Sequence, residues 1–292
     1  MIRWRDLVRS TVVHSPVDDA RRRNRRRMVM SLVAGILTTV VLALPCSAAA
    51  SDPEAVDAAI VLAVDTSSSI DPAKADSQRQ GHAAALRSHE VRAAIEGGAT
   101  GCIAITYVEW ASVGELNTVL PWTKLCNESD LEAAADVILN RGDNGLERKG
   151  RGRTSLSFAI DISAFLLERR PGHANRKIID LSSNGTNNDG PPVARSRQAA
   201  LEKGYVINAI AVSRSEPGVT RDLPGYYRQE LIGGAGSFVI APDGIEDYVV
   251  AMRRKLVLEI AGLTPRFTDC VSGQSLVLVM PVSSETKAGC LQ

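Results

Sequence analysis

A short polar run after an apolar segment carries the residues best suited to chemistry. Asp65, Ser67 and Ser69 alternate in the sequence DTSSS, directly after the apolar run 58–64. Alternate residues of extended backbone point to the same side, so one carboxylate and two hydroxyls can converge. Oxygen ligands of this kind suit a hard cation such as Mg²⁺, which keeps several waters. The alternative is a serine-rich loop that caps the following helix, with Ser69 or Asp71 as the N-cap.

Two later positions carry side chains that could join this set. Thr154 lies in the sequence GRTS, where a charged, glycine-rich loop meets a predicted helix. Asn184 follows a predicted strand at 177–182, in the sequence SSNG. In open α/β sheets, ligands bind just beyond the carboxyl ends of the strands, which is where Asn184 falls. The alternative role for Thr154 is that of a helix N-cap.

The sequence contains none of the motifs that would make this set an enzyme active site. There is no G-x-S-x-G elbow and no G-x-x-x-x-G-K-S/T loop, and His82, His89 and His173 are scattered without metal-ligand spacing. Because no histidine falls on a predicted strand-end loop, hydrolysis would have to use a metal-bound water. We therefore expect no enzymatic activity, and an exported metal-assisted hydrolase is the weakest alternative.

The elements that would position these residues alternate between strand and helix. Continuous apolar runs such as 58–64 are typical of strands that helices cover on both faces. Predicted strands occupy 58–64, 102–109, 113–120, 177–182, 205–212 and 237–240. Predicted helices occupy 71–96, 131–139 (after a capping box at Ser129 and Glu132), 154–170, 193–203, 223–232 and 245–260. This order predicts the α/β class, with a mostly parallel central sheet, helices on both faces and one antiparallel strand, 113–120.

Together these motifs resemble the von Willebrand factor type A (vWA) domain and its metal-ion-dependent adhesion site (MIDAS). That site combines D-x-S-x-S, a threonine on a second loop and an aspartate on a third. Asp65, Ser67 and Ser69 match the first loop and Thr154 matches the second. Segments such as VDTSSSID, LPWTKL, GRTSLSFAI and IDLSSNGTNNDG more narrowly resemble an exported bacterial branch known only as a domain of unknown function, over about 57–262. The resemblance implies a Rossmann-like vWA fold.

The third loop departs from the family pattern. Asn184 stands where the family has aspartate. Its amide oxygen can still accept a hydrogen bond from a metal-bound water, but a full negative charge is lost. We therefore expect Mg²⁺ or Mn²⁺ to bind weakly or not at all. Asp189, in the same loop, is an alternative ligand, whereas Asp180 lies within the predicted strand and is expected to be structural.

The charge of the chain is unevenly distributed. Its formal net charge is +1, yet residues 1–50 hold nine arginines and three aspartates, which leaves 25 basic and 30 acidic residues in the remainder. Nucleic-acid binding needs a clustered basic face, and stacking on bases needs aromatic side chains. A mildly acidic body in a chain with only 4% aromatic residues argues against such partners.

The first fifty residues are typical of an export signal. The basic run 21–27 precedes an apolar segment at 28–44 and a run of small residues. This order predicts a signal peptide that is cleaved after Ala48 or Ala50, and a periplasmic or extracellular location. The alternative is an uncleaved anchor, which would be the only membrane contact. Lipidation of Cys46 and a start at Met28 or Met30 are further alternatives.

Export also bears on the cysteines and the domain boundaries. Four cysteines remain after the signal, and we favour the pairs Cys102–Cys126 and Cys270–Cys290, which close short loops; free buried thiols are the alternative. We expect a signal peptide or anchor at 1–50, a linker at 51–57, a vWA-like domain at 58–262 and a C-terminal appendage at 263–292.

The resemblance also implies a function. In the vWA family, the metal keeps one coordination position open, and an acidic side chain of a protein partner fills it. Our leading hypothesis is therefore an exported binding module that uses Asp65, Ser67, Ser69, Thr154 and Asn184 for protein–protein interaction. The alternative is a metal-independent structural subunit of an envelope assembly.

Overall fold

The computed structural model describes residues 54–141, 152–212, 222–242 and 247–263. These residues form a six-stranded sheet in the order β3-β2-β1-β4-β5-β6. The strands are β1 (Val56–Asp65), β2 (Ile103–Trp110), β3 (Leu116–Leu125), β4 (Ala174–Ser183), β5 (Val206–Ala211) and β6 (Val239–Ile240). Neighbouring strands run parallel except for β3, which lies at one edge and is antiparallel to β2. The predicted mostly parallel sheet with one antiparallel edge strand is confirmed.

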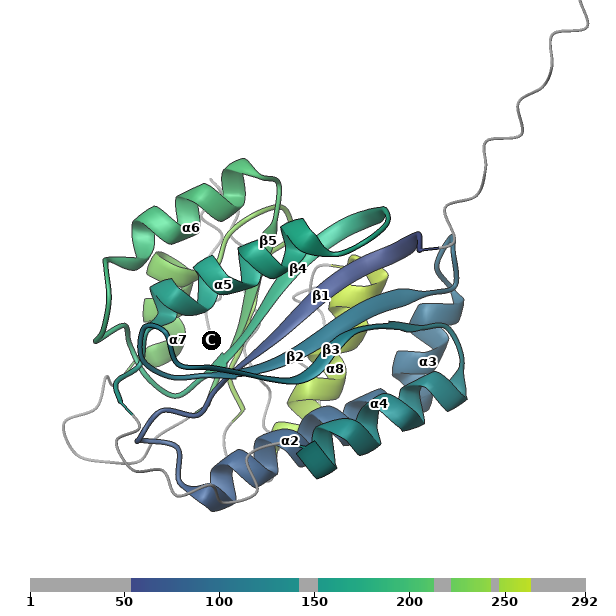
Figure 1. The fold of residues 1–292 in the computed structure, drawn as a ribbon, viewed down its shortest axis with the longest axis horizontal. Coiled ribbons are helices and arrows are strands. Elements are labelled where there is room, and N and C mark those ends of the chain that lie inside the picture. Colours follow the sequence, from purple (N-terminus) through teal and green to yellow (C-terminus); the bar gives the residue numbers. More distant parts are fainter. Residues whose placement is uncertain (1–53, 142–151, 213–221, 243–246, 264–292) are drawn as a thin grey trace, which may run out of the picture. The chain divides into compact units, whose positions relative to one another are not determined.

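Helices cover both faces of this sheet, as predicted (Figure 1). One face carries α2 (Pro72–Leu86), α3 (His89–Glu96), α4 (Glu128–Arg141) and α8 (Tyr248–Ala261). The other face carries α5 (Leu156–Arg169), α6 (Val193–Glu202), α7 (Leu223–Tyr226) and the π-helical turn η1 (Tyr227–Leu231).

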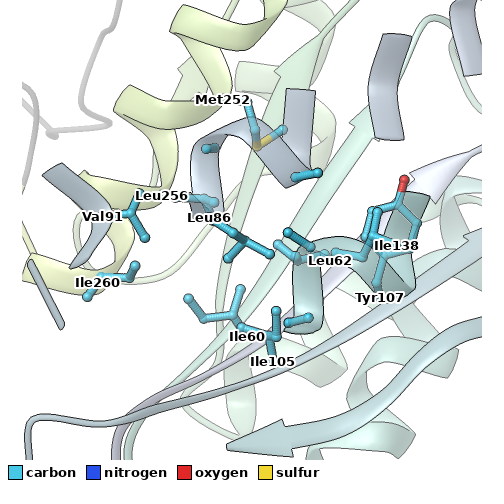
Figure 2. Close-up of a cluster of buried hydrophobic side chains, with 14 of the residues drawn as sticks. Ile60, Leu62, Leu86, Val91, Ile105, Tyr107, Ile138, Met252, Leu256 and Ile260 are labelled. Carbon is cyan, nitrogen blue, oxygen red and sulfur yellow. The ribbon is translucent and has the colours of Figure 1, made fainter. Parts of the chain in front are cut away.

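The central strand β1 shows why the two faces form. Ile60 and Leu62 point into the core beneath α2, α4 and α8, where Figure 2 shows them among other apolar side chains. Val61 and Ala63 point into the second core, beneath α5 and α6. All four side chains are completely buried, which explains the unbroken apolar run: a strand covered on both faces has no solvent side for polar residues.

The predicted single helix at 71–96 is wrong, because the chain forms two helices there. Asp71 caps α2 as expected, with its Oδ1 accepting a hydrogen bond from Lys74 N at 2.9 Å. Ser88 then interrupts the helix, and its Oγ accepts a hydrogen bond from Val91 N at 3.3 Å. A serine hydroxyl that competes for backbone N–H groups favours a new N-cap over a helix interior.

The predicted capping box before the next helix is also wrong. The helix α4 begins at Glu128, so Ser129 lies inside its first turn. The capping role falls to Asn127, whose Oδ1 accepts a hydrogen bond from Asp130 N at 3.1 Å. Asparagine is as good an N-cap as serine, and the helix starts where that side chain can reach.

Cys102 and Cys126 form a disulfide bond, which confirms the first predicted pair. The bond joins the segment before β2 to the segment after β3, the antiparallel edge strand. The predicted pair Cys270–Cys290, the export signal and the appendage beyond Leu263 lie outside the described residues. Among the helices of the described residues, none combines the length and the apolar character needed to cross a membrane.

Candidate functional site

Three loops meet at the carboxyl edge of the sheet. The first follows β1 at Asp65, and another follows β4 at Ser183. Because β1 and β4 are parallel neighbours, with Val64 opposite Ser182, their ends emerge side by side. The remaining loop enters α5 and carries Thr154.

The structure brings the five predicted side chains together. Ser67 Oγ lies 3.2 Å from Ser69 Oγ and 3.1 Å from Thr154 Oγ1. Ser69 Oγ donates a hydrogen bond to Asn184 Oδ1 at 2.8 Å. Asp65 joins the set through its Oδ1, which accepts a hydrogen bond from Ser67 N at 2.7 Å. Residues separated by more than a hundred positions therefore share one continuous polar cluster.

Asp65 supplies the single carboxylate of this cluster, and it is completely buried. Its Oδ2 accepts a hydrogen bond from Ser183 Oγ at 2.6 Å. Burial raises the pKa of Asp65 above its ordinary value, and the hydrogen bonds from Ser183 and Ser67 oppose that rise. Ser183 was not among the predicted site residues, although its place between a predicted strand and Asn184 is a usable signal.

Asn184 ties the third loop to the first in both directions. Its Oδ1 accepts from the hydroxyl of Ser69, and its Nδ2 donates to the backbone oxygen of Ser69 at 3.2 Å. Asn184 is completely buried. An aspartate at this position would have no donor for the second bond. The amide is therefore not simply a weaker ligand; it links two loops that a carboxylate would link only in part.

Thr154 does not cap the following helix, because Ser155 has that role. Ser155 Oγ accepts a hydrogen bond from Phe158 N at 3.4 Å. Thr154 is held instead by Asn188 of the third loop: Thr154 N donates to Asn188 Oδ1 at 2.8 Å, and Asn188 N donates to Thr154 O at 3.0 Å. The Thr154 hydroxyl is thereby left to face Ser67.

The two other acidic candidates lie in different surroundings. Asp189 Oδ2 accepts a hydrogen bond from Val113 N at 2.8 Å, which ties the third loop to the turn between β2 and β3. Asp180 lies 2.5 Å from Lys255 Nζ, in the interior beneath α8. Neither contact involves the five clustered side chains.

Two tyrosines fix the third loop from the side of α7 and η1. Tyr227 is completely buried and donates its hydroxyl hydrogen to Gly185 O at 2.9 Å. Tyr226 OH accepts a hydrogen bond from Asn187 N at 3.3 Å. Burial raises the pKa of Tyr227 well above its ordinary value, so this phenol stays a donor. The loop that carries Asn184 is therefore held along its length.

A pocket of about 490 Å³ adjoins the same loop. It lies between Asn187, the start of α6 and the α7–η1 segment. Its lining is mixed, with Val193 and Tyr226 beside the acidic side chains of Asp222 and Glu230. The carboxyl edge thus offers both a polar cluster and a neighbouring hollow.

The donor set of the cluster suits a hard cation in type but not in charge. It offers one carboxylate, three hydroxyls and one amide, all of them oxygen ligands of the kind that Mg²⁺ accepts. Among the described residues, no group of three or more His, Cys, Asp or Glu side chains could hold a metal. A cation in this cluster would therefore depend on neutral oxygens and on Asp65 alone.

The order and direction of the strands give the predicted vWA-like fold. Within that class, the sequence matches the family described as "Protein of unknown function (DUF1194)" over residues 55–264, and the chain belongs to this family. No curated protein matches the sequence.

Several solved structures are similar to this chain at low sequence identity. The pilus adhesin SpaC from Lactobacillus rhamnosus GG has a TM-score of 0.53 at 13% identity, over 71% of this chain and 31% of that one. The vWF domain of the type V pili tip protein Mfa5 from Porphyromonas gingivalis has a TM-score of 0.48 at 10% identity, over 72% and 97%. Proximal thread matrix protein 1 from the mussel byssus, with a zinc-occupied MIDAS motif, has a TM-score of 0.48 at 18% identity, over 70% and 48%. The chain thus spans less than a third of SpaC.

Proposed function

We propose that this protein is an exported, non-enzymatic binding module that recognises a protein partner through the loops at the carboxyl edge of its sheet. The observation that carries the proposal is the convergence of Asp65, Ser67, Ser69, Thr154 and Asn184 in one hydrogen-bonded cluster. The partner's contact group is an acidic side chain, as in the vWA family that the motifs resemble. The similarity to a pilus adhesin agrees with an extracellular or envelope location.

The residues that would hold a divalent cation, Mg²⁺ or Mn²⁺, are those five. The cation would supply positive charge for the partner's carboxylate. Affinity for the cation is low, because Asn184 contributes no charge and burial disfavours the ionised form of Asp65. The cluster keeps its shape by the paired hydrogen bonds between Ser69 and Asn184, so the loops are organised before any cation binds.

The surroundings of the cluster offer further contacts to a partner. Val113 is 53% exposed at the turn that Asp189 anchors. The pocket beside Asn187 adds an aromatic ring and two carboxylates. A partner that reaches the cluster with an acidic side chain would therefore find an apolar side chain and a hollow among the neighbouring loops.

The same hydrogen bonds favour a second candidate, a metal-independent structural subunit of an envelope assembly. Asn184 makes two bonds to Ser69 that close the first and third loops onto each other. If these bonds replace a cation in function, the edge would bind its partner equally well in the presence of a chelator.

Calorimetric titration of the purified chain with Mg²⁺ and Mn²⁺ tests the proposal. We expect weak binding that Asp65→Ala abolishes and that Asn184→Asp strengthens by about 10-fold or more. Asp189→Asn is the matched control, since it removes a carboxylate from the same loop but not from the cluster, and it should leave binding unchanged. If the wild type and Asn184→Asp both fail to bind Mg²⁺ and Mn²⁺, the cation site is rejected and the metal-independent subunit remains as the proposed function.

A further inference from the structure

A second buried polar cluster lies beneath α8, outside the site described above. Lys255 Nζ lies 2.5 Å from Asp180 Oδ1 of β4 and 2.6 Å from Glu259 Oε1, one turn along α8. All three side chains are completely shielded from solvent. Two carboxyl groups thus share one ammonium group in the interior.

The charges of this cluster do not balance if every group is ionised. Two carboxylates and one ammonium leave one negative charge, and an uncompensated buried charge is costly. Loss of the proton from Lys255 would worsen the imbalance. Uptake of a proton by a carboxylate removes it.

The hydrogen bonds around Glu259 indicate where that proton belongs. Glu259 Oε1 is already an acceptor, for Lys255 Nζ and for Asn208 Nδ2 at 2.9 Å. Glu259 Oε2 and Asp180 Oδ2 are buried and have no hydrogen-bond donor within the described part of the chain. A proton on Oε2 would make it a donor, and the carboxyl group of Asp180 lies against the same ammonium group as that of Glu259. One proton therefore neutralises the excess negative charge and supplies the hydrogen-bond donor that the two carboxyl groups lack.

The surrounding titratable groups do not supply the missing positive charge. On α2, burial lowers the pKa of His82 to about 4, so its ring is neutral at neutral pH. On β2 and α8, burial raises the pKa of Tyr107 and of Tyr248, so both phenols are neutral as well.

The guanidinium groups near α8 hydrogen-bond or pair with groups other than the two clustered carboxyls. Arg176 of β4 donates to the backbone oxygens of Glu259 and Ile260, and its charge is attracted by both Asp57 and the Glu259 side chain. Arg253 pairs with Glu90 of α3 at 3.3 Å, where both side chains are partly exposed. Of all these groups, Lys255 alone places a positive charge in direct contact with both carboxyl groups.

We propose that Asp180, Lys255 and Glu259 form a buried proton-binding clamp, in which one proton shared by the two carboxyl groups holds α8 against β4. Burial and the neighbouring Asp180 raise the pKa of Glu259 to about 8. Mildly alkaline conditions therefore remove the proton and leave a buried negative charge at the α8–β4 contact. The folded state binds this proton more tightly than an opened state does, so the contact weakens as the pH rises toward the pKa of the folded form.

Two measurements on the intact chain test the clamp. A carbon-13 NMR titration of the Glu259 carboxyl group should give a midpoint near pH 8, whereas exposed glutamates titrate near about 4.3. Amide hydrogen exchange, corrected for its intrinsic base catalysis, should show protection of α8 falling about 10-fold between pH 7 and pH 9, as linkage to one proton requires.

Substitutions identify the group responsible. Glu259→Gln replaces the protonated carboxyl with a neutral group of the same shape, so the pH dependence of α8 protection should disappear. Glu90→Gln removes the α3 partner of Arg253, away from the buried cluster, and should leave the 10-fold fall unchanged. A Glu259 midpoint below pH 6 would overturn the proposal, and that titration needs only the wild-type chain should Glu259→Gln fail to fold. Unchanged pH dependence in a folded Glu259→Gln variant would also overturn it.

Discussion

The two buried polar clusters of this protein, at the carboxyl edge of the sheet and beneath α8, are built on opposite principles. At the edge, one carboxylate is surrounded by hydroxyls and an amide, and Asp65 receives hydrogen bonds on both oxygens. Beneath α8, three formally charged groups lie in contact, and Glu259 Oε2 has no donor within the described residues. The first cluster holds a single carboxylate that hydrogen bonds stabilise, whereas the second depends on a proton.

The largest effect is expected when the second cluster loses its ammonium group. Lys255→Met leaves Asp180 and Glu259 without their ammonium partner, and losing one member of a buried ion pair costs about 3–5 kcal/mol. Urea unfolding measures the loss. Arg253→Met is the control on the same helix; it removes a partly exposed pair and should cost less than about 1 kcal/mol. Similar losses in both variants would contradict the view that the buried cluster matters more to stability than the partly exposed pair.

The next largest effect is the pH dependence of stability that the second cluster contributes through Glu259. The folded-state pKa of Glu259, about 8, lies above its unfolded value of about 4.3, so the free energy of unfolding falls as the pH rises between them. His82, with a pKa of about 4 in the folded state, opposes this fall below about pH 6.5.

A net fall of up to about 1.4 kcal/mol per pH unit is therefore expected between pH 6.5 and 8. Urea unfolding at closely spaced pH values measures it. Glu259→Gln should flatten this range, and a slope that survives the substitution would assign the effect to another group.

Adding a second carboxylate to the first cluster tests whether its stability depends on holding only one. Asn184→Asp removes the donor to Ser69 O and adds a second buried carboxylate near Asp65, so we expect a loss of about 2 kcal/mol without divalent ions. Added Mg²⁺ should recover part of the loss, because the two carboxylates then share a cation. Thermal unfolding with and without Mg²⁺ gives both values. Equal loss in both conditions would mean that the edge cannot use a cation.

The smallest expected effect concerns a single hydrogen bond within the first cluster. Ser183→Ala deletes the donor to Asp65 Oδ2 and should cost about 1 kcal/mol. Asp65 keeps its bond from Ser67 N, so the loops should remain in place. Ser163→Ala, a buried serine that bonds within α5, gives the matched control for a loss unrelated to the site. Urea unfolding of both variants measures the two losses. An NMR titration of Asp65 should show a pKa above the wild-type value in Ser183→Ala only, because the Ser183 hydrogen bond lowers that pKa.

Much of the fold could be predicted from the sequence because its signals are local. The apolar run 58–64 predicts a strand covered on both faces, and that strand is the centre of the sheet. The break between α2 and α3 was missed because Ser88 interrupts a segment that otherwise looks helical throughout. The shift of the capping residue to Asn127 was missed for a related reason: several side chains near a helix start can cap it.

The candidate site was only partly predictable. The spacing of Asp65, Ser67 and Ser69 indicates a shared side of the chain, while Thr154 and Asn184 were placed through resemblance to the vWA family. No pattern predicted that Ser183 would bond Asp65, that Asn188 would hold Thr154 or that Tyr227 would fix the third loop. These contacts join segments that meet only after folding.

The sequence by itself determined the alternating elements, the composition of the first loop and the asparagine at position 184 of the third loop, because each is a property of neighbouring residues. Only the tertiary structure decided the state of the charged groups. Asp180 and Glu259 are 79 positions apart, and nothing local distinguishes them from surface acids. Their burial against a single lysine makes a proton part of the fold, since charge balance depends on which groups meet away from water.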